Sequence, residues 1–249
     1  YYVENGILNW GYTGLTKYYS TWYMVVNGQL DWKFNDVTYY FGTWYYVKNG
    51  VLDWNYTGLT QHCGTWYYVD HGRINWDYTG LTKYYSTWYM VVNGQLDWNF
   101  TNLTQYYGTW YYVENGKLNW NFTDLFQYFG TWYRIRGGVL DWNYTGLAYH
   151  AGGYYYINHG VLDWNYSGSA QIDGKGRYYE VVNGVMIYSA LDKMRELVRN
   201  ETSPTNYIIL VDRAAHRVGI FKGGKNNWQD AQYYKCCVGK PSTPTVSGT

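Results

Sequence analysis

A glycine that returns every 22 residues constrains this fold more than any other feature of the sequence. From Gly6 to Gly160 the second residue of an Asn-Gly-like pair keeps this spacing, and a more divergent copy follows 24 residues later at Gly184. Residues 12–32 and 78–98 are identical, three repeats apart. A fixed period of about 20 to 50 residues indicates stacked structural repeats. The chain is therefore predicted to be an all-β solenoid of stacked β-hairpins.

The copy at residues 42–63 shows why each unit should be a hairpin. Asn-Gly at 49–50 stands between β-rich runs, which is typical of a two-residue type I′ turn. Side chains then alternate between two faces of the hairpin. The first face holds Tyr45, Val47, Leu52 and Trp54, which hardly vary between copies and are predicted to form the core. The second face holds Trp44, Tyr46, Lys48, Val51 and Asp53.

The segment after each hairpin is predicted to contain a second tight turn. The Gly58 position is Gly, Asn or Asp in every copy, and these residues tolerate a positive φ. Tyr56 and Leu59 are interpreted as apolar plugs between hairpins. His62, His150 and Cys63 replace aromatic or small residues of other copies, and we interpret them as packing variants because no second ligand lies at zinc-site spacing.

Composition excludes several function classes. The net charge of +1 argues against nucleic acid and anionic membrane as partners. No run of about 18 apolar residues is present, so no membrane span is expected. Aromatic residues make up 23% of the chain, and their π faces suit sugars and cations. No metal site and no cofactor is predicted.

The second face of the hairpin is the predicted ligand site. Two rings beside a carboxylate would suit a quaternary ammonium, and rings with hydrogen-bond acceptors would suit a sugar. The candidate binding residues are Trp44, Tyr46, Asp53, Trp66, Tyr68, Trp110 and Tyr112. Copies with Met24, Met90 or Arg134 at the Tyr46 position should be weaker or empty. The alternative is that these rings only stack on the neighbouring repeat.

The unit GTWYYVKNGVLDWNYTGL resembles the aromatic cell-wall-binding repeats of Gram-positive bacteria, relatives of choline-binding and glucan-binding modules. The resemblance covers residues 1–188. It implies stacked hairpins with ligands in aromatic cages between consecutive hairpins, an extracellular, cell-wall-associated protein, and a partner such as peptidoglycan glycan, teichoic acid or glucan. The DWNYTGL segment departs from the choline-binding pattern, so choline specificity is not implied.

The period is lost after Trp164, and the last part of the chain reads as a different fold. Ser189 is expected to cap a short helix, and residues 189–205 are interpreted as a helix and linker. Strands are predicted at residues 207–212 and 217–222, with a third near 228–238. We expect a partial β domain at 206–249.

The segment NYIILVDRAAHRVGIF, followed by GKPSTPTVSGT, resembles the start of an L,D-transpeptidase (YkuD-type) catalytic domain. That family cross-links peptidoglycan through an acyl-enzyme on a cysteine in an SHGC-type motif. The motif is absent here, so no catalytic residue is assigned. Cys236 and Cys237 lie in a predicted strand and are interpreted as small apolar residues.

Three functions remain open at this point. The array could anchor a cell-wall cross-linking enzyme, serve as a spacer for such an enzyme, or self-associate as an aromatic rod without a small ligand. Because the sequence opens within a repeat at Tyr1 and stops early in the second domain, we expect it to be a piece of a longer protein.

Overall fold

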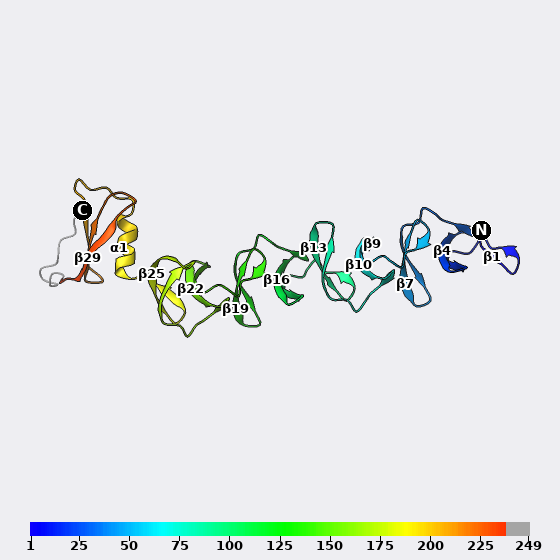
Figure 1. The fold of residues 1–249 in the computed structure, drawn as a ribbon, viewed down its shortest axis with the longest axis horizontal. Coiled ribbons are helices and arrows are strands. Elements are labelled where there is room, and N and C mark those ends of the chain that lie inside the picture. Colours follow the sequence, from blue (N-terminus) through cyan, green and yellow to red (C-terminus); the bar gives the residue numbers. More distant parts are fainter. Residues whose placement is uncertain (238–249) are drawn as a thin grey trace. The chain divides into compact units, whose positions relative to one another are not determined.

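The computed structural model describes residues 1–237, except for the side chains of residues 175–177. The chain divides into two units, Tyr1–Trp142 and Asn143–Thr249. Unit 1 is a β-solenoid of hairpins that follow one another along the chain (Figure 1). Unit 2 contains two further repeats, a short helix and a three-stranded sheet.

Each repeat consists of three strands rather than two. A first strand of five residues, a central strand of six to eight and a short strand of two or three follow one another as an antiparallel ladder. The first strands are β3 (Gly14–Tyr18), β6 (Asp36–Tyr40), β9 (Gly58–His62), β12 (Gly80–Tyr84), β15 (Asn102–Tyr106), β18 (Asp124–Tyr128), β21 (Gly146–His150) and β24 (Gly168–Ile172). The central strands are β4 (Thr21–Val26), β7 (Thr43–Lys48), β10 (Thr65–Asp70), β13 (Thr87–Val92), β16 (Thr109–Glu114), β19 (Thr131–Arg136), β22 (Gly153–Asn158) and β25 (Lys175–Val182). The short strands are β5 (Gln29–Leu30), β8 (Val51–Leu52), β11 (Arg73–Ile74), β14 (Gln95–Leu96), β17 (Lys117–Leu118), β20 (Val139–Leu140), β23 (Val161–Leu162) and β26 (Val185–Ile187). An isolated pair, β1 (Val3–Glu4) and β2 (Ile7–Leu8), precedes them.

The register predicted from the Asn-Gly pair is confirmed. Val47 lies opposite Leu52, and Lys48 lies opposite Val51. Asn49 has φ of 50° and Gly50 of 73°, as a type I′ turn requires.

The predicted second turn at Gly58 is wrong. Gly58 instead begins strand β9, and the tight turn lies five residues later, at Cys63 and Gly64. Asp36, Asn102 and Asp124, which take the Gly58 position in other copies, are likewise the first residues of strands. This turn joins the first strand to the central strand, so each repeat is a longer hairpin than the sequence indicated.

Successive repeats are joined through the glycine of the Asn-Gly turn. The Tyr46 N–H donates to the Gly72 carbonyl at 2.9 Å, and the Gly72 N–H donates to the Tyr56 carbonyl at 2.9 Å. A Cβ on Gly72 would lie 2.6 Å from the Asp53 carbonyl oxygen. The glycine is therefore required both for its φ of 73° and for close approach to the preceding repeat.

The connector threonine supports the same turn. The Thr57 hydroxyl accepts from the backbone N–H of His71 at 3.1 Å, and Thr13, Thr79 and Thr101 do the same for the turns that follow them. This contact explains why threonine recurs at this place in the repeat. It also ties each Asn-Gly turn to the segment before it, so that the turn keeps its register with the preceding repeat.

Small apolar clusters, each shared by two neighbouring repeats, form the core of unit 1. Leu15 and Met24 of one repeat pack with Val47 and Leu52 of the next. The predicted plug Leu59 is 1% exposed and packs with Val91 and Leu96 of the next repeat. Because each hairpin buries its apolar residues only against its neighbours, an isolated hairpin has little core of its own.

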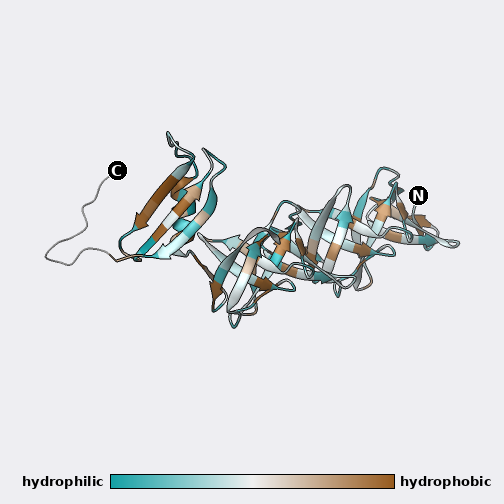
Figure 2. Ribbon diagram, turned by 60° about the vertical axis from the view of Figure 1, so that its left-hand side comes forward, coloured by the Kyte–Doolittle hydropathy of each residue, from teal (hydrophilic) through white to brown (hydrophobic). Residues whose placement is uncertain are grey.

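The helix and the last three strands form a separate small core within unit 2. Helix α1 (Ala190–Val198) begins at Ser189 with a capping box to Asp192, as the sequence predicted. Strands β27 (Tyr207–Asp212), β28 (Arg217–Lys222) and β29 (Gln229–Lys235) form an antiparallel sheet. Apolar residues mark its strands in Figure 2.

The helix is not a simple connector, because it packs on this sheet. Met194 and Val198 contact Phe221, which is 0% exposed. The Arg195 guanidinium also bonds the carboxylates of Asp192 on the helix and Asp230 on β29. The predicted GKPSTPT loop lies at residues 239–245, outside the described residues.

Candidate functional site

An aromatic cage lies between the first two complete hairpins of unit 1. Leu15 and Trp22 come from one hairpin, and Tyr45 and Trp54 come from the next. They surround a cavity of about 380 Å³, whose other lining residues are Tyr40, Phe41, Leu52 and Arg73. Trp22 lies 5.2 Å from Tyr40 and Tyr45 lies 5.7 Å from Trp54, measured between ring centroids, and both pairs are edge-to-face. The cage therefore presents two ring pairs around one hollow.

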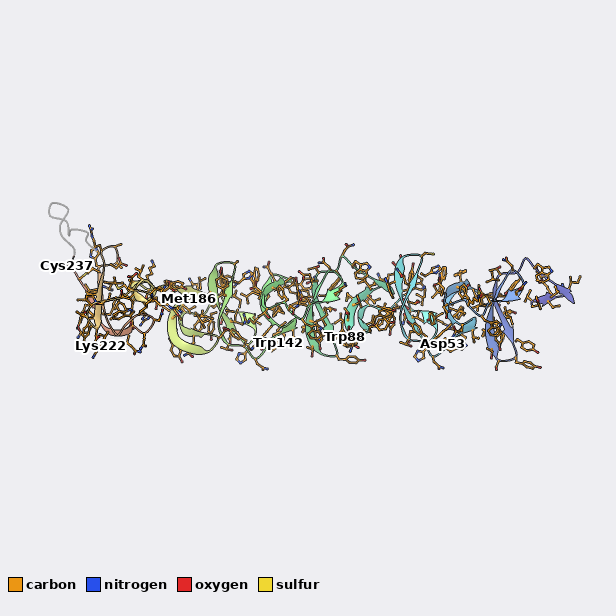
Figure 3. All side chains as sticks on the ribbon, turned by 90° about the horizontal axis from the view of Figure 1, so that it is seen from above. Asp53, Trp88, Trp142, Met186, Lys222 and Cys237 are labelled. Atoms are coloured by element: carbon orange, nitrogen blue, oxygen red, sulfur yellow. The ribbon has the colours of Figure 1, made fainter. Side chains whose placement is uncertain are left out.

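A second cage repeats this arrangement 66 residues later. It is lined by Leu81, Trp88, Tyr106, Tyr111, Leu118 and Trp120 and has a volume of about 90 Å³. Trp88 lies 5.1 Å from Tyr106, and Tyr111 lies 6.0 Å from Trp120. Trp88 is labelled among the side chains of unit 1 in Figure 3. The two cavities have equivalent walls because they lie between equivalent hairpins.

The predicted tryptophans Trp44, Trp66 and Trp110 are members of further ring pairs, of which Trp66–Tyr84 is edge-to-face and the other two are tilted. Trp44 lies 5.2 Å from His62, Trp66 lies 4.9 Å from Tyr84, and Trp110 lies 5.4 Å from Tyr128. These positions match Trp22 and Trp88 of the two cavities. Their role in binding stays a prediction, and the geometry is compatible with it.

The predicted tyrosines of the same strands lie elsewhere. Tyr46 and Tyr68 stack face to face on Tyr56 and Tyr78 of their own repeats, with centroids 4.0 and 3.8 Å apart. Tyr112 stacks on Phe122 and is only 4% exposed. Burial raises the pKa of Tyr46, with a smaller contribution from the Asp53 charge. These rings pack the solenoid. The cavities lined by Trp22 and by Trp88 lie at the Met24 and Met90 copies, where weaker sites were expected.

The structure therefore differs from the sequence prediction in which face of the hairpin is buried in the core and which lines the cavities. Trp54, expected in the core, is 39% exposed, and the equivalent Trp32, Trp98 and Trp120 are 46–56% exposed. Tyr45 and Trp54 scarcely vary between copies, and this constancy predicts packing in the core. Constancy alone does not separate a packed ring from the wall of a repeated ligand cage.

Asp53, the predicted carboxylate of the site, belongs to a turn. Its Oδ1 accepts from the backbone N–H of Asn55 at 3.0 Å, and its carbonyl accepts from Tyr56 N–H at 3.3 Å. Asp31, Asp97 and Asp163 make the same side-chain contact in their repeats. The residue therefore shapes the segment that carries Trp54, and any contact with a ligand stays a prediction.

Basic side chains contact two of the aromatic walls. The Arg73 guanidinium lies 5.4 Å from the Tyr45 ring and 5.2 Å from the Trp54 ring. The Lys117 ammonium lies 6.0 Å from Tyr89 and 5.5 Å from Trp98. Both distances fall within the range of cation–π attraction, so these walls are suited to positive charge.

His62 and Cys63 differ from simple packing variants. The His62 Nδ1 lies 2.9 Å from a carboxylate oxygen of Asp36, and its Nε2 lies 3.5 Å from the Cys63 sulfur. Cys63 is exposed, in a turn with φ of 47°. Among the described residues no group of His, Cys, Asp and Glu is arranged to hold a metal ion.

An exposed aromatic side chain occupies the first position of most hairpin turns. Tyr19, Phe41, Tyr85, Tyr107 and Phe129 are 85–90% exposed and have φ between 43° and 52°. A positive φ is unusual for a bulky residue, and no turn residue in the sequence indicates it. Phe41 also lines the first cavity, next to Tyr40.

The comparisons with known proteins identify the repeat. The choline-binding repeat family matches seven successive segments, residues 11–31, 33–53, 55–75, 77–97, 99–119, 121–141 and 143–163, which together make up more than half of the chain. The protein therefore belongs to the choline-binding repeat family. The comparison with curated proteins found no match.

Among solved structures, the chain is similar to an alternansucrase in complex with isomaltotriose. The identity is 14% and the TM-score 0.27, over 80% of this chain and 17% of the alternansucrase chain. This chain thus spans a small part of that protein's length. In the described part of the chain, no helix is both long enough and apolar enough to cross a membrane.

Proposed function

We propose that the hairpin array is a binding module that attaches its protein to a polymer of the bacterial cell envelope. The observation that carries the proposal is the pair of equivalent cages, each with two edge-to-face ring pairs between consecutive hairpins. Electron-rich ring faces attract a quaternary ammonium and also stack on the apolar face of a sugar. Membership of the choline-binding repeat family favours a choline-type substituent as the first ligand to test.

Repetition gives the module its strength. A single exposed cage of this kind would bind a small cation weakly, but several cages on one array can engage several substituents of one polymer. Avidity then exceeds the affinity of any one cage. We infer an extracellular, cell-wall-associated protein, with peptidoglycan glycan, teichoic acid or glucan as the polymer.

The proposal also covers the end of the chain. We infer that residues 206–249 open an L,D-transpeptidase-like domain, so that the module would concentrate a peptidoglycan cross-linking enzyme at its substrate. Strands β27, β28 and β29, found where the sequence predicted them, are compatible with this reading. The parent gene tests it, because an SHGC motif should follow within the same polypeptide.

The array is tested directly by titration with small ligands. Choline, a soluble muropeptide and a glucan oligosaccharide would each be added while tryptophan fluorescence is recorded. Trp22, Trp54, Trp88 and Trp120 line the cages, so saturable quenching or a spectral shift is expected for the ligand class that binds. No change with any of the three would contradict the proposal.

A second function is favoured by the exposed turn aromatics. Tyr19, Phe41, Tyr85, Tyr107 and Phe129 would let copies of the array associate through their hairpin tips. In this reading the chain is a self-associating structural module without a small ligand. Sedimentation over a range of protein concentrations separates the two, because only self-association predicts a concentration-dependent mass that choline does not alter.

A further inference from the structure

The residue that follows each Asn-Gly turn stands beside an aromatic wall of the preceding repeat. In the inter-repeat pairing, Arg73 lies opposite Tyr45 and Lys117 lies opposite Tyr89. Val51 and Val139 take the same place opposite Tyr23 and Tyr111. The pairing is the same in all four repeats, but the charges differ. Val51 and Val139 lie opposite Lys48 and Arg136 across their own turns, whereas Arg73 and Lys117 lie opposite Asp70 and Glu114.

Arg73 and Lys117 each place a positively charged side chain beside one of these aromatic walls. Each contacts both rings of a Tyr–Trp pair at 5.2–6.0 Å, whereas valine offers no charge. Arg73 also lines the cavity of about 380 Å³. A bound quaternary ammonium would have to share the rings with this charge at close range, where like charges repel.

The carboxylate that lies across the turn from Arg73 is held by another partner. Asp70 lies opposite Arg73 across the turn, but its Oδ1 is 2.7 Å from the His71 ring nitrogen. Within residues 1–237, Arg73 forms no ion pair, and its cation–π contacts are with Tyr45 and Trp54. A guanidinium stacked on rings keeps its N–H donors in a planar fork that matches a carboxylate or phosphate.

We propose that the residue after the Asn-Gly turn selects the charge of the ligand in each cage, and this inference rests on the proposed function. The Tyr23–Trp32 and Tyr111–Trp120 walls, flanked by Val51 and Val139, accept a quaternary ammonium. The Tyr45–Trp54 and Tyr89–Trp98 walls, flanked by Arg73 and Lys117, reject it and accept a sugar that carries an oxyanion. The array is then a mixed receptor, suited to a polymer with both cationic and anionic substituents.

Calorimetric titration of the complete chain tests this inference. The stoichiometry of choline binding gives the number of cages that accept an ammonium. Glucuronate tests a carboxylate as the bound oxyanion, and glucose 1-phosphate tests a phosphate. The variants are R73V, K117V and their combination, with V139R as the reverse exchange. Valine already occupies this position in four repeats, at Val51, Val139, Val161 and Val185, so these variants are matched to the fold.

The expected result is a switch of ligand class. R73V should gain one choline site, R73V/K117V two, and V139R should lose one. R73V should also weaken the binding of the preferred oxyanion by about tenfold or more. If glucuronate and glucose 1-phosphate differ, the tighter of the two identifies the anion.

The outcomes separate the inference from the proposed function. If the wild type binds choline and R73V/K117V binds it at the same number of sites, charge selection is overturned and the binding module stands. If neither protein binds choline, the ammonium cages themselves are refuted. Oxyanion binding that is unchanged in R73V would also overturn the role of Arg73. Circular dichroism of every variant confirms that the array is folded.

Discussion

At the residue scale, the unusual chemistry of this protein lies in one hairpin turn. Cys63 is exposed, His62 bonds Asp36, and the His62 Nε2 lies 3.5 Å from the Cys63 sulfur. A histidine oriented by a carboxylate can act as a general base that takes the thiol proton as the sulfur attacks an electrophile. No other repeat has cysteine at this position.

This contact predicts that Cys63 is alkylated faster than an ordinary exposed thiol. Iodoacetamide should modify Cys63 several-fold more slowly in H62Y, which carries the tyrosine found in most other repeats, and D36N should have a smaller effect. Peptide mass spectrometry gives the rates, with Cys237 as the internal reference. Equal rates in the wild type and H62Y would mean that the contact does not activate the thiol.

At the scale of the element, glycine controls how hairpins stack. Gly72 and Gly64 both have a positive φ, 73° and 83°, but a Cβ on Gly72 would meet the backbone of the preceding repeat, whereas one on Gly64 would meet nothing within 4 Å. The two residues therefore separate the cost of backbone strain from the cost of lost stacking.

Gly72→Ala is expected to destabilise the chain by about 3 kcal/mol or more, because strain and a backbone clash add. Gly64→Ala is the control and should cost about 1 kcal/mol, from its φ alone. Denaturant unfolding followed by circular dichroism measures both. Similar losses for the two variants would show that the close approach at Gly72 does not matter.

The sequence predicted the Asn-Gly hairpin in detail because two local signals agreed there. The turn residues fixed the register, and the constant Val47 and Leu52 identified the buried face, where they are 0% and 6% exposed. The second turn was missed because Cys63 and its aromatic equivalents carry no turn signal. The ligand cage was predicted only in part. Trp22 lies on the face predicted to bind, whereas Tyr45 and Trp54 lie on the face that their constancy assigned to the core.

At the scale of the whole molecule, stacked tyrosines make the fold sensitive to high pH. Burial raises the pKa of Tyr56 to about 12, with smaller contributions from neighbouring tyrosines and Asp53. Desolvation also raises the pKa values of Tyr12, Tyr46, Tyr68, Tyr78, Tyr84, Tyr106, Tyr112 and Tyr156. The folded state therefore prefers the neutral phenol more strongly than the unfolded chain does.

The sign of the pH dependence follows from these shifts. Below pH 10, the ordinary pKa of tyrosine, the phenols are neutral in both states and this stabilisation is complete. Between pH 10 and about 12 the unfolded chain loses protons that folded Tyr56 retains, so stability should fall as pH rises. Denaturation midpoints at a series of pH values check this, and constant midpoints from pH 9 to 12 would contradict it.

The central claim is that the cages between hairpins bind a cell-envelope polymer. Retention on purified cell walls tests this claim most directly. The cage variant W22A/W54A/W88A/W120A removes the tryptophan walls of two cages. The control variant Y19A/Y85A removes aromatic residues that are solvent-exposed in the hairpin turns. The account predicts that retention falls at least about tenfold in the cage variant, because avidity depends on the number of occupied cages, and stays near wild type in the turn variant. Equal retention of the folded cage variant and the wild type would contradict it.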